Sequence, residues 1–328
     1  NGNDAGELYA IHHTGDNVQG FPVNIGERMS AGPAVGDLDG DGILEIVICT
    51  WGEKIYVYDK FGALKFEKAT SKRFNTPATL VDIDNDSDLE IVAGNDDGQL
   101  FVLHHDGSEL AFFDTGDDIR GGISVADVDD DGSYELLFAG YDDMLHIWKP
   151  LSDTELDGWP LDMGSNSVTE PLTADLDNDG DLELIVNNVD QEAQIYRNNS
   201  TNNFIKVKLK GSDQNLIGID SRVFVKTPNN SQMQELTLSR GFQSSVSTYL
   251  NFGLGDESII ESVKVVWPNG NSEQLNNVDI NTTIEFDINN SNKETSSDEK
   301  LNIGTYVKVS FGKKDLTGVV WNLYEQKT

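Results

Sequence analysis

The stretch GDLDGDGILEIVI, from Gly36 to Ile48, places four carboxylates within nine positions and then turns apolar. Two like charges about 4 Å apart repel by roughly 4 kcal/mol at an effective dielectric constant near 20. The apolar run that begins after Glu45 is rich in β-branched residues and has the length of a β-strand. We therefore expect a tight loop that leads into a strand and holds a positively charged group.

The same pattern of alternating acidic residues occurs four times, and we number the copies loop 1 to loop 4. They span residues 37–45, 82–90, 127–135 and 175–183, and each is followed by a short apolar run. The first aspartates of successive loops are 45, 45 and 48 residues apart. Because repeats of this length are typical of β-propeller blades and similar arrays, the pattern predicts the organisation of the fold.

Oxygen ligands at alternate positions of a tight loop suit a hard cation such as Ca²⁺. An EF-hand would need a glutamate at the twelfth position and a helix after it. Here the twelfth positions hold Ile48, Ala93, Phe138 and Val186, and the acidic residue comes at the ninth. We expect calcium loops that connect β-strands, with about four Ca²⁺ ions per chain. The alternative is that the loops are solvated acidic turns.

In each loop the first, third, fifth and ninth residues are expected to supply carboxylate oxygens and the seventh a backbone carbonyl. The predicted ligands are Asp37, Asp39, Asp41, Ile43 and Glu45 in loop 1; Asp82, Asp84, Asp86, Asp88 and Glu90 in loop 2; Asp127, Asp129, Asp131, Ser133 and Glu135 in loop 3; and Asp175, Asp177, Asp179, Asp181 and Glu183 in loop 4. Glycine at the sixth position allows a left-handed backbone in three loops, whereas Ser87 in loop 2 costs on the order of 1 kcal/mol. We expect loop 2 to bind most weakly unless Asp88 compensates.

Each repeat contains four short strand-like runs separated by Asn, Asp and Gly turns, as expected for a four-stranded blade. Residues 7–198 resemble the FG-GAP and VCBS blades of integrin-like β-propellers, whose D-x-D-x-D-G loops bind calcium. The resemblance implies an all-β fold in which residues 1–200 form a β-propeller with four calcium-loop blades. An N-terminal half-blade without an acidic loop precedes them, and it favours a larger propeller with further blades upstream. A small, four-bladed propeller is the alternative.

After the repeats, alternating segments predict a second, small antiparallel β-domain over residues 203–288. The segments LIGIDSRVFV, SRGFQSSVSTYLNFGLGD and VKVVWPNGNSEQL resemble the ASPIC/UnbV domain of cartilage acidic proteins and many bacterial secreted proteins. Gly218 and Arg222 stand at the glycine and arginine positions of that family, whereas Asp220 replaces its usual glycine. The resemblance implies no catalytic role.

The end of the chain differs from both domains. Residues 289–300 are polar and predict a linker. Residues 301–328 contain two strand-like runs, and because two strands rarely stand alone in water we expect them to dock on the body of the protein. An attachment or sorting element is the alternative.

Charge and composition restrict the partners and the location. A formal net charge of -34 over 328 residues disfavours binding to nucleic acid or to an anionic membrane. No apolar run reaches the length of a membrane span, so membrane insertion is not expected.

Calcium would relieve the repulsion within the loops, and folding is therefore expected to depend on calcium. The single Cys49 forms no internal disulfide, and millimolar calcium is found outside cells, so we expect a processed chain that is secreted or at the cell surface.

Every strong motif serves metal binding or architecture, and none assembles a nucleophile, a base and an oxyanion site. We expect a calcium-stabilised binding or adhesion module for a glycan or an extracellular protein, with further domains of the same protein as additional partners. One alternative is a carbohydrate-active propeller enzyme, a polysaccharide lyase or glycoside hydrolase, in which the recurring Arg28, Arg73 and Arg120 contact the substrate. Our first interpretation of these arginines is salt bridges between blades. The other alternative is a structural segment of a larger surface protein.

Overall fold

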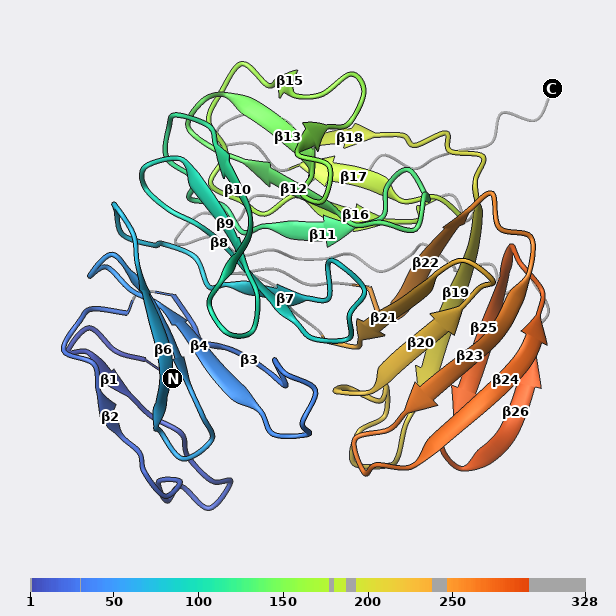
Figure 1. The fold of residues 1–328 in the computed structure, drawn as a ribbon, viewed down its shortest axis with the longest axis horizontal. Coiled ribbons are helices and arrows are strands. Elements are labelled where there is room, and N and C mark those ends of the chain that lie inside the picture. Colours follow the sequence, from blue (N-terminus) through green and yellow to red (C-terminus); the bar gives the residue numbers. More distant parts are fainter. Residues whose placement is uncertain (1, 30, 177–179, 187–192, 238–246, 295–328) are drawn as a thin grey trace. The chain divides into compact units, whose positions relative to one another are not determined.

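β-Strands are the only regular secondary structure in the part of the chain that the structure describes (Figure 1). The computed structural model describes all residues except 1, 30, 177–179, 187–192, 238–246 and 295–328. The described residues up to 294 belong to one compact unit, and the predicted C-terminal tail, residues 301–328, lies outside the described residues. None of the described elements is a helix of the length and apolarity needed to cross a membrane. The all-β prediction is confirmed.

The acidic repeats form antiparallel sheets in chain order. Their strands are β1 (Glu7–Leu8), β2 (Val23–Asn24), β3 (Ala34–Gly36), β4 (Glu45–Cys49), β5 (Lys54–Tyr58), β6 (Leu64–Ala69), β7 (Thr79–Val81), β8 (Glu90–Gly94), β9 (Gln99–Leu103), β10 (Glu109–Asp114), β11 (Ser124–Ala126), β12 (Glu135–Ala139), β13 (Met144–Lys149), β14 (Thr154–Glu155), β15 (Leu161–Asp162), β16 (Leu172–Ala174), β17 (Glu183–Val186) and β18 (Gln194–Tyr196). The first two repeats give four-stranded sheets, β3-β4-β5-β6 and β10-β9-β8-β7. The third gives β11-β12-β13-β14 with β15 also paired to β13, and the described part of the fourth gives β16-β17-β18. The short pair β1-β2 precedes them.

Each acidic loop joins the first strand of its sheet to the second, and strand pairing fixes both ends of the loop. The residue before the first aspartate pairs with the ninth-position glutamate in all four repeats: Gly36 with Glu45, Val81 with Glu90, Ala126 with Glu135 and Ala174 with Glu183. A shift of the register by one residue would turn every side chain to the opposite face, so the buried strands specify this pairing. The strands therefore force the carboxylates of each loop together.

Successive sheets pack on each other through shared apolar cores. Val47 of the first sheet lies in one core cluster with Ile91 of the second, and Val102 of the second lies in another with Trp148 of the third. A third cluster joins the third and fourth sheets, and Leu8 of the β1-β2 pair packs with residues of the first sheet. The repeats thus form a stack of sheets, because each sheet buries a face that it cannot cover alone.

The second β-domain consists of two four-stranded sheets, β22-β19-β25-β26 and β21-β20-β23-β24. Its strands are β19 (Asn203–Lys210), β20 (Arg222–Lys226), β21 (Ser231–Glu235), β22 (Tyr249–Gly255), β23 (Ile260–Val266), β24 (Ser272–Val278), β25 (Thr282–Asp287) and β26 (Asn290–Glu294). Val207 and Phe252 of one sheet share a core cluster with Val225 and Val263 of the other, so the two sheets pack face to face. The prediction of an antiparallel domain is wrong for one pair, since β19 and β25 run parallel. The long connection through the other sheet brings β25 back in this direction.

The predicted linker overlaps a strand. Residues 290–294 form β26, which pairs antiparallel with β25 at the end of its sheet. The sequence NSNKE lacks the apolar alternation of a half-buried strand, and backbone pairing alone makes it part of the sheet. The second β-domain therefore extends beyond the boundary at residue 288 that the sequence pattern predicted.

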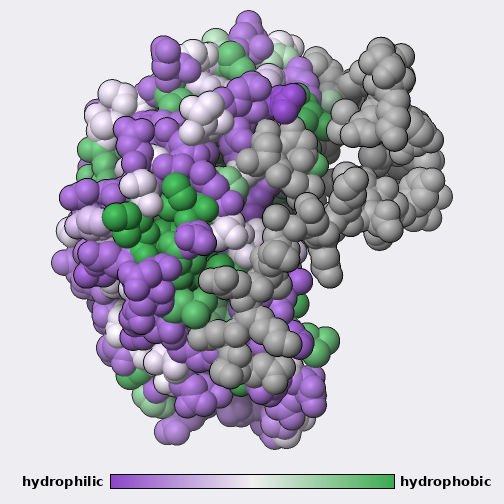
Figure 2. All heavy atoms as spheres, turned by 90° about the vertical axis from the view of Figure 1, so that its right-hand side faces the viewer, coloured by the Kyte–Doolittle hydropathy of each residue, from purple (hydrophilic) through white to green (hydrophobic). Residues whose placement is uncertain are grey.

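The face of the molecule shown in Figure 2 is largely hydrophilic. Figure 2 shows one face of the molecule, on which hydrophilic residues predominate and hydrophobic residues gather in a limited area. The exposed large apolar side chains include Phe61 and Leu216. Single exposed apolar residues are normal in soluble folds and indicate no binding surface by themselves.

The shared cores predict a clear difference between two phenylalanines. Phe138 is 0% exposed and stacks on His146, with ring centroids 4.8 Å apart, whereas Phe61 is 57% exposed. Phe138→Ala should lower the free energy of unfolding by about 3–5 kcal/mol, because it leaves a cavity. Phe61→Ala should change it by less than about 0.5 kcal/mol. Urea unfolding at a fixed calcium concentration measures both, and equal losses would contradict the packing described here. Phe138→Leu gives an intermediate loss if Phe138→Ala does not fold.

Candidate metal centres

The ninth-position glutamate of every loop is held by the backbone of the loop itself. Its Oε2 accepts a hydrogen bond from the N–H of the second loop residue: Leu38 to Glu45 at 3.0 Å, Ile83 to Glu90 at 2.8 Å, Val128 to Glu135 at 2.8 Å and Leu176 to Glu183 at 2.7 Å. All four glutamates are buried. The recurrence of this bond means that the glutamate carboxylate is fixed beside the aspartates in each loop.

The first aspartate of the loop binds the backbone of the turn. In loop 3, Asp127 accepts hydrogen bonds from Asp131 N and Gly132 N, both at 2.9 Å. In loop 2, Asp82 accepts the equivalent bonds from the fifth and sixth residues, both at 3.1 Å. Ser87 adopts a φ of 79°, close to the 89° of Gly132. The serine therefore takes the left-handed conformation that the glycines of the other loops adopt, as expected from the sequence.

Carboxylate oxygens converge within loops 1, 2 and 3. Groups whose ligand atoms all lie within 4.8 Å of one another are Asp37, Asp39 and Glu45; Asp82, Asp84 and Asp86; Asp84, Glu90 and His104; and Asp127, Asp129 and Glu135. Ca²⁺ binds oxygen ligands at about 2.3–2.6 Å, so two ligands of one ion can lie up to about 5 Å apart. Asp37 is 2% exposed, and its Oδ1 has no hydrogen-bond partner, which leaves a buried oxygen for a metal. The donor sets fit calcium.

Some predicted ligands make other contacts. Asp41 Oδ1 accepts a hydrogen bond from Ile43 N at 2.7 Å, and Asp131 Oδ1 accepts one from Ser133 N at 2.8 Å. The fifth-position carboxylates of loops 1 and 3 therefore also stabilise the turn. Asp88, at the seventh position of loop 2, pairs through its side chain with an imidazole. The metal-binding carbonyls of the seventh positions stay a prediction.

Loop 4 is only partly described. Asp177 and Asp179 lie outside the described residues. Asp175 contacts the Lys206 ammonium, and Asp181 is buried. The described residues of this loop therefore define no complete ligand set, and its metal site stays a prediction.

Burial raises the pKa of several loop carboxyls. Burial, with the charges of neighbouring aspartates, raises the pKa of Asp82 to about 7 and that of Glu90 to about 8. The pKa of Glu135 is raised to about 8, mainly by burial and next by Asp129. These shifts mean that the ionised forms of Asp82, Glu90 and Glu135 are disfavoured in the metal-free loops 2 and 3. A cation in the loop would offset this cost.

Cationic side chains that the sequence analysis did not identify lie against the loops. Lys65 contacts loop 1, Lys149 contacts loop 3, and Arg222 Nη2 lies 2.7 Å from Asp37 Oδ2. His104 lies with Nδ1 3.3 Å from Glu90 Oε1 of loop 2. His104 and Lys149 hold the same position in their repeats, 22 residues after the first aspartate of the loop, whereas Lys65 and Arg222 do not share this spacing.

The recurring arginines pair with acidic and aromatic neighbours. Arg73 and Arg120 both contact Asp96, at 2.6 Å and 3.0 Å, and Asp96 follows β8 of the second sheet. Arg28 lies 3.7 Å from the ring centroid of Trp51, which follows β4, and Arg73 lies 4.6 Å from the same centroid. Because Arg73 and Arg120 precede the second and third sheets, their contacts join neighbouring repeats. The geometry favours the salt-bridge interpretation over a role in substrate binding.

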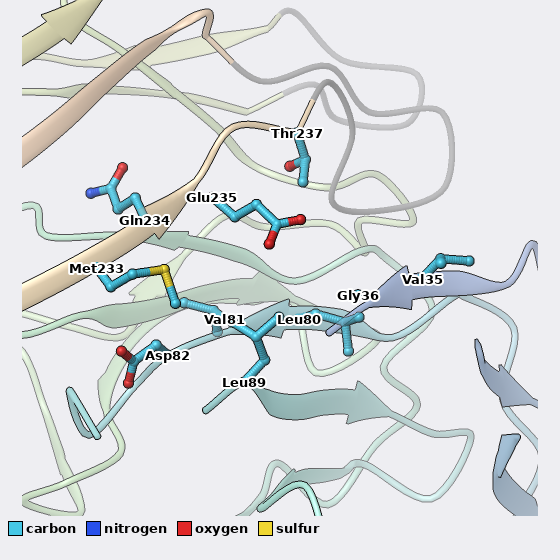
Figure 3. Close-up of a pocket in the computed structure, with 10 residues that line it drawn as sticks. All are labelled: Val35, Gly36, Leu80, Val81, Asp82, Leu89, Met233, Gln234, Glu235 and Thr237. Atoms are coloured by element: carbon cyan, nitrogen blue, oxygen red, sulfur yellow. The ribbon is translucent and has the colours of Figure 1, made fainter. Parts of the chain in front are cut away.

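Two cavities lie near the loops. Figure 3 shows the smaller one, lined by residues that include Val81, Asp82 and Glu235, with a volume of about 30 Å³. This volume holds one or two water molecules rather than an organic ligand. The larger and more open cavity, of about 380 Å³, has a polar lining that includes Gln232 and Asp256.

One known protein family matches a segment in the C-terminal part of the chain. Residues 211–293 match the protein family described as ASPIC and UnbV. This match, over about a quarter of the chain, confirms the resemblance to the ASPIC/UnbV domain. No curated protein matches the chain.

Solved structures that are similar to the chain include a designed protein and two natural ones. The computationally designed Ika4 protein is 16% identical over 53% of this chain and 92% of its own, with a TM-score of 0.38. Sqt1 of Saccharomyces cerevisiae is 15% identical over 60% of this chain and 54% of its own, with a TM-score of 0.45. BamB of Moraxella catarrhalis is 13% identical over 88% of this chain and 85% of its own, with a TM-score of 0.42. The chain thus spans about half of the Sqt1 structure.

The ASPIC/UnbV region contacts loops 1 and 3. Its Arg222, the arginine singled out by the resemblance, makes the ion pair with Asp37 of loop 1. Gly253 lies so close to loop 3 that a Cβ there would collide with an oxygen of Asp127. Two first-position carboxylates are therefore buried partly by the acidic repeats and partly by the ASPIC/UnbV region.

Without calcium, the stability of the protein should fall as the pH rises from about 4 to 8. Asp82, Glu90 and Glu135 have folded-state pKa values raised to about 7 or 8, above their unfolded values near 4. The folded state therefore binds more protons than the unfolded state in this window, and the stability present at low pH is lost as the pH rises through 7 to 8. Urea unfolding in chelator at pH 5, 6, 7 and 8 measures this, and Glu90→Gln should flatten the profile. A stability that rises with pH over this range would contradict the assignment.

Proposed function

We propose that loops 1 to 4 bind Ca²⁺ and that the chain is a calcium-stabilised extracellular binding module. The observation that carries the proposal is the convergence of buried carboxylates in three described loops, each with its glutamate fixed by the loop backbone. In loop 1, Asp37, Asp39 and Glu45 would hold the ion, and the equivalent residues would do so in loops 2 and 3. A bound ion supplies the positive charge that the clustered carboxylates need.

We further propose that the acidic repeats are propeller blades of the FG-GAP/VCBS type. Antiparallel sheets that stack in chain order, each with its acidic loop between the first two strands, support this assignment. The two-stranded β1-β2 pair is proposed as the half-blade that precedes the first complete one. Rigid stacked sheets with short connections present loops for recognition.

The proposed partner is a glycan or an extracellular protein. The open cavity of about 380 Å³ supports a polar ligand, because Asn229, Asn230 and Gln232 in its lining offer amides and Asp256 and Glu257 offer carboxylates. These groups donate and accept hydrogen bonds in the manner that hydroxyl groups require. The net charge of -34 favours a neutral or cationic partner. Millimolar calcium outside cells would keep even weak loops filled.

Calcium should raise the melting temperature of the protein, because a ligand that binds only the folded state stabilises it by about 4 kcal/mol per site at a thousand times its dissociation constant. Calorimetric titration should detect up to four ions, and Asp127→Asn should remove one of them. Asp153→Asn, on an exposed turn outside the loops, is the matched control. An unchanged melting temperature between chelator and 2 mM Ca²⁺ would refute the calcium assignment.

A panel of polysaccharides and matrix proteins tests the binding function directly. Immobilised protein should retain at least one of them in calcium and release it in chelator, with no change in the length of the retained chains. Product release would instead support the carbohydrate-active enzyme. No retention by a protein that binds calcium normally would favour the structural segment.

A further inference from the structure

Lys149 lies at the place in loop 3 where the carboxylates converge. Its Nζ is 2.6 Å from Asp129 Oδ2, 2.7 Å from Asp131 Oδ2 and 3.4 Å from Glu135 Oε1. An ammonium group has three N–H donors, and here it faces three carboxylates. Three of the five predicted ligands of this loop therefore contact one lysine.

Lys65 makes the equivalent contact in loop 1. Its Nζ is 2.8 Å from Asp39 Oδ2 and 3.1 Å from Glu45 Oε1. Lys65 belongs to β6, the fourth strand of its sheet, whereas Lys149 ends β13, the third strand of its sheet. Two loops thus receive an ammonium group from different positions of the repeat, so the arrangement is not a simple copy of one repeat residue.

Loop 2 differs from these two loops. Among the ion pairs of the described residues, its carboxylates meet imidazoles rather than ammonium groups: His104 Nδ1 is 3.3 Å from Glu90, and His105 Nδ1 is 2.9 Å from Asp88. An imidazole can ligate a metal through a ring nitrogen. His104 already belongs to a group with Asp84 and Glu90 whose ligand atoms lie within 4.8 Å.

An ammonium group and Ca²⁺ compete for the same oxygens. The nitrogen stands 2.6–3.1 Å from its closest carboxylate oxygens in loops 1 and 3, and a calcium ion would need those oxygens at about 2.3–2.6 Å. Both cations cannot lie within this distance of the same oxygens, because they would overlap and repel each other. Asp37 Oδ1 is buried and has no hydrogen-bond partner, so Lys65 leaves part of the ligand set of loop 1 unused.

We propose that Lys65 and Lys149 are built-in competitors of Ca²⁺, which displaces their ammonium groups when it enters loops 1 and 3. The inference rests on the proposed calcium function and adds an order of filling. Among loops 1 to 3, loop 2 is the one whose ion pairs in the described part of the chain include no lysine, and it fills at the lowest calcium concentration. This order is the reverse of the one expected from Ser87. The strain of the serine is already present in the metal-free loop, so calcium binding does not add to it. In loops 1 and 3, by contrast, calcium must displace an ammonium group.

Amine labelling tests the displacement in the intact protein. An acylating reagent, read out by mass spectrometry, should modify Lys65 and Lys149 at least several-fold faster in calcium than in chelator. Lys54, which pairs with Glu67 at 3.0 Å outside the loops, is the internal control and should react equally in both. Calcium binding without any change at Lys65 and Lys149 would overturn the proposal.

Lysine variants test the competition by affinity. Lys149→Met and Lys65→Met should each raise the calcium affinity of one site by roughly tenfold or more, since the competing charge is removed. Lys54→Met should leave all affinities unchanged, and Glu90→Gln should abolish the site that fills first. If Lys149→Met and Lys65→Met bind calcium no more tightly than the wild type while loop 2 still binds it, the competition is overturned and the calcium function stands. Absence of calcium binding in the wild type and in the double variant Lys65→Met/Lys149→Met would overturn both this inference and the calcium function.

Discussion

Repulsion between carboxylates at the first turn of each acidic repeat is the constraint on which the rest of the structure depends. The pairing of β3 with β4, and of the equivalent strands in the other repeats, brings the two ends of each loop together. The buried strands set this pairing, so the charges cannot move apart without loss of the apolar core. A cation, whether a metal ion or a side chain, would relieve this repulsion where the carboxylates meet.

The ASPIC/UnbV region adds to this arrangement rather than standing apart from it. Arg222 neutralises part of the charge of loop 1, and the backbone at Gly253 lies directly against loop 3. Its sheets are held by an apolar core of their own, which includes Phe252 and Trp267. The region thus has an independent core and also shields acidic groups of the repeats from water, which strengthens the electrostatic interactions there.

The sequence allowed the acidic loops, the strands after them and the second β-domain to be predicted, because each depends on a local pattern of charge or apolar alternation. The bond from the second loop residue to the ninth follows from the same spacing. Arg222 could not be predicted, since packing brings it to loop 1 from a distant part of the chain. Lys65 and Lys149 belong to the same repeats as their loops, but other residue types stand at the equivalent positions of the other repeats, so no common pattern marked them. Strand β26 was missed because its position in the sheet depends on backbone pairing and not on apolar residues.

The parallel pairing of β19 with β25 affects the order in which the molecule can form during synthesis. Each acidic repeat finds its strand partners within its own repeat, so these sheets can assemble one after another as the chain emerges. Strand β19 instead lies between β22 and β25, and both neighbours are made much later. Pairing over such sequence distances is slow. The nascent chain therefore carries the unpaired edges of β19 until its last neighbour arrives, and this interval is its main exposure to aggregation.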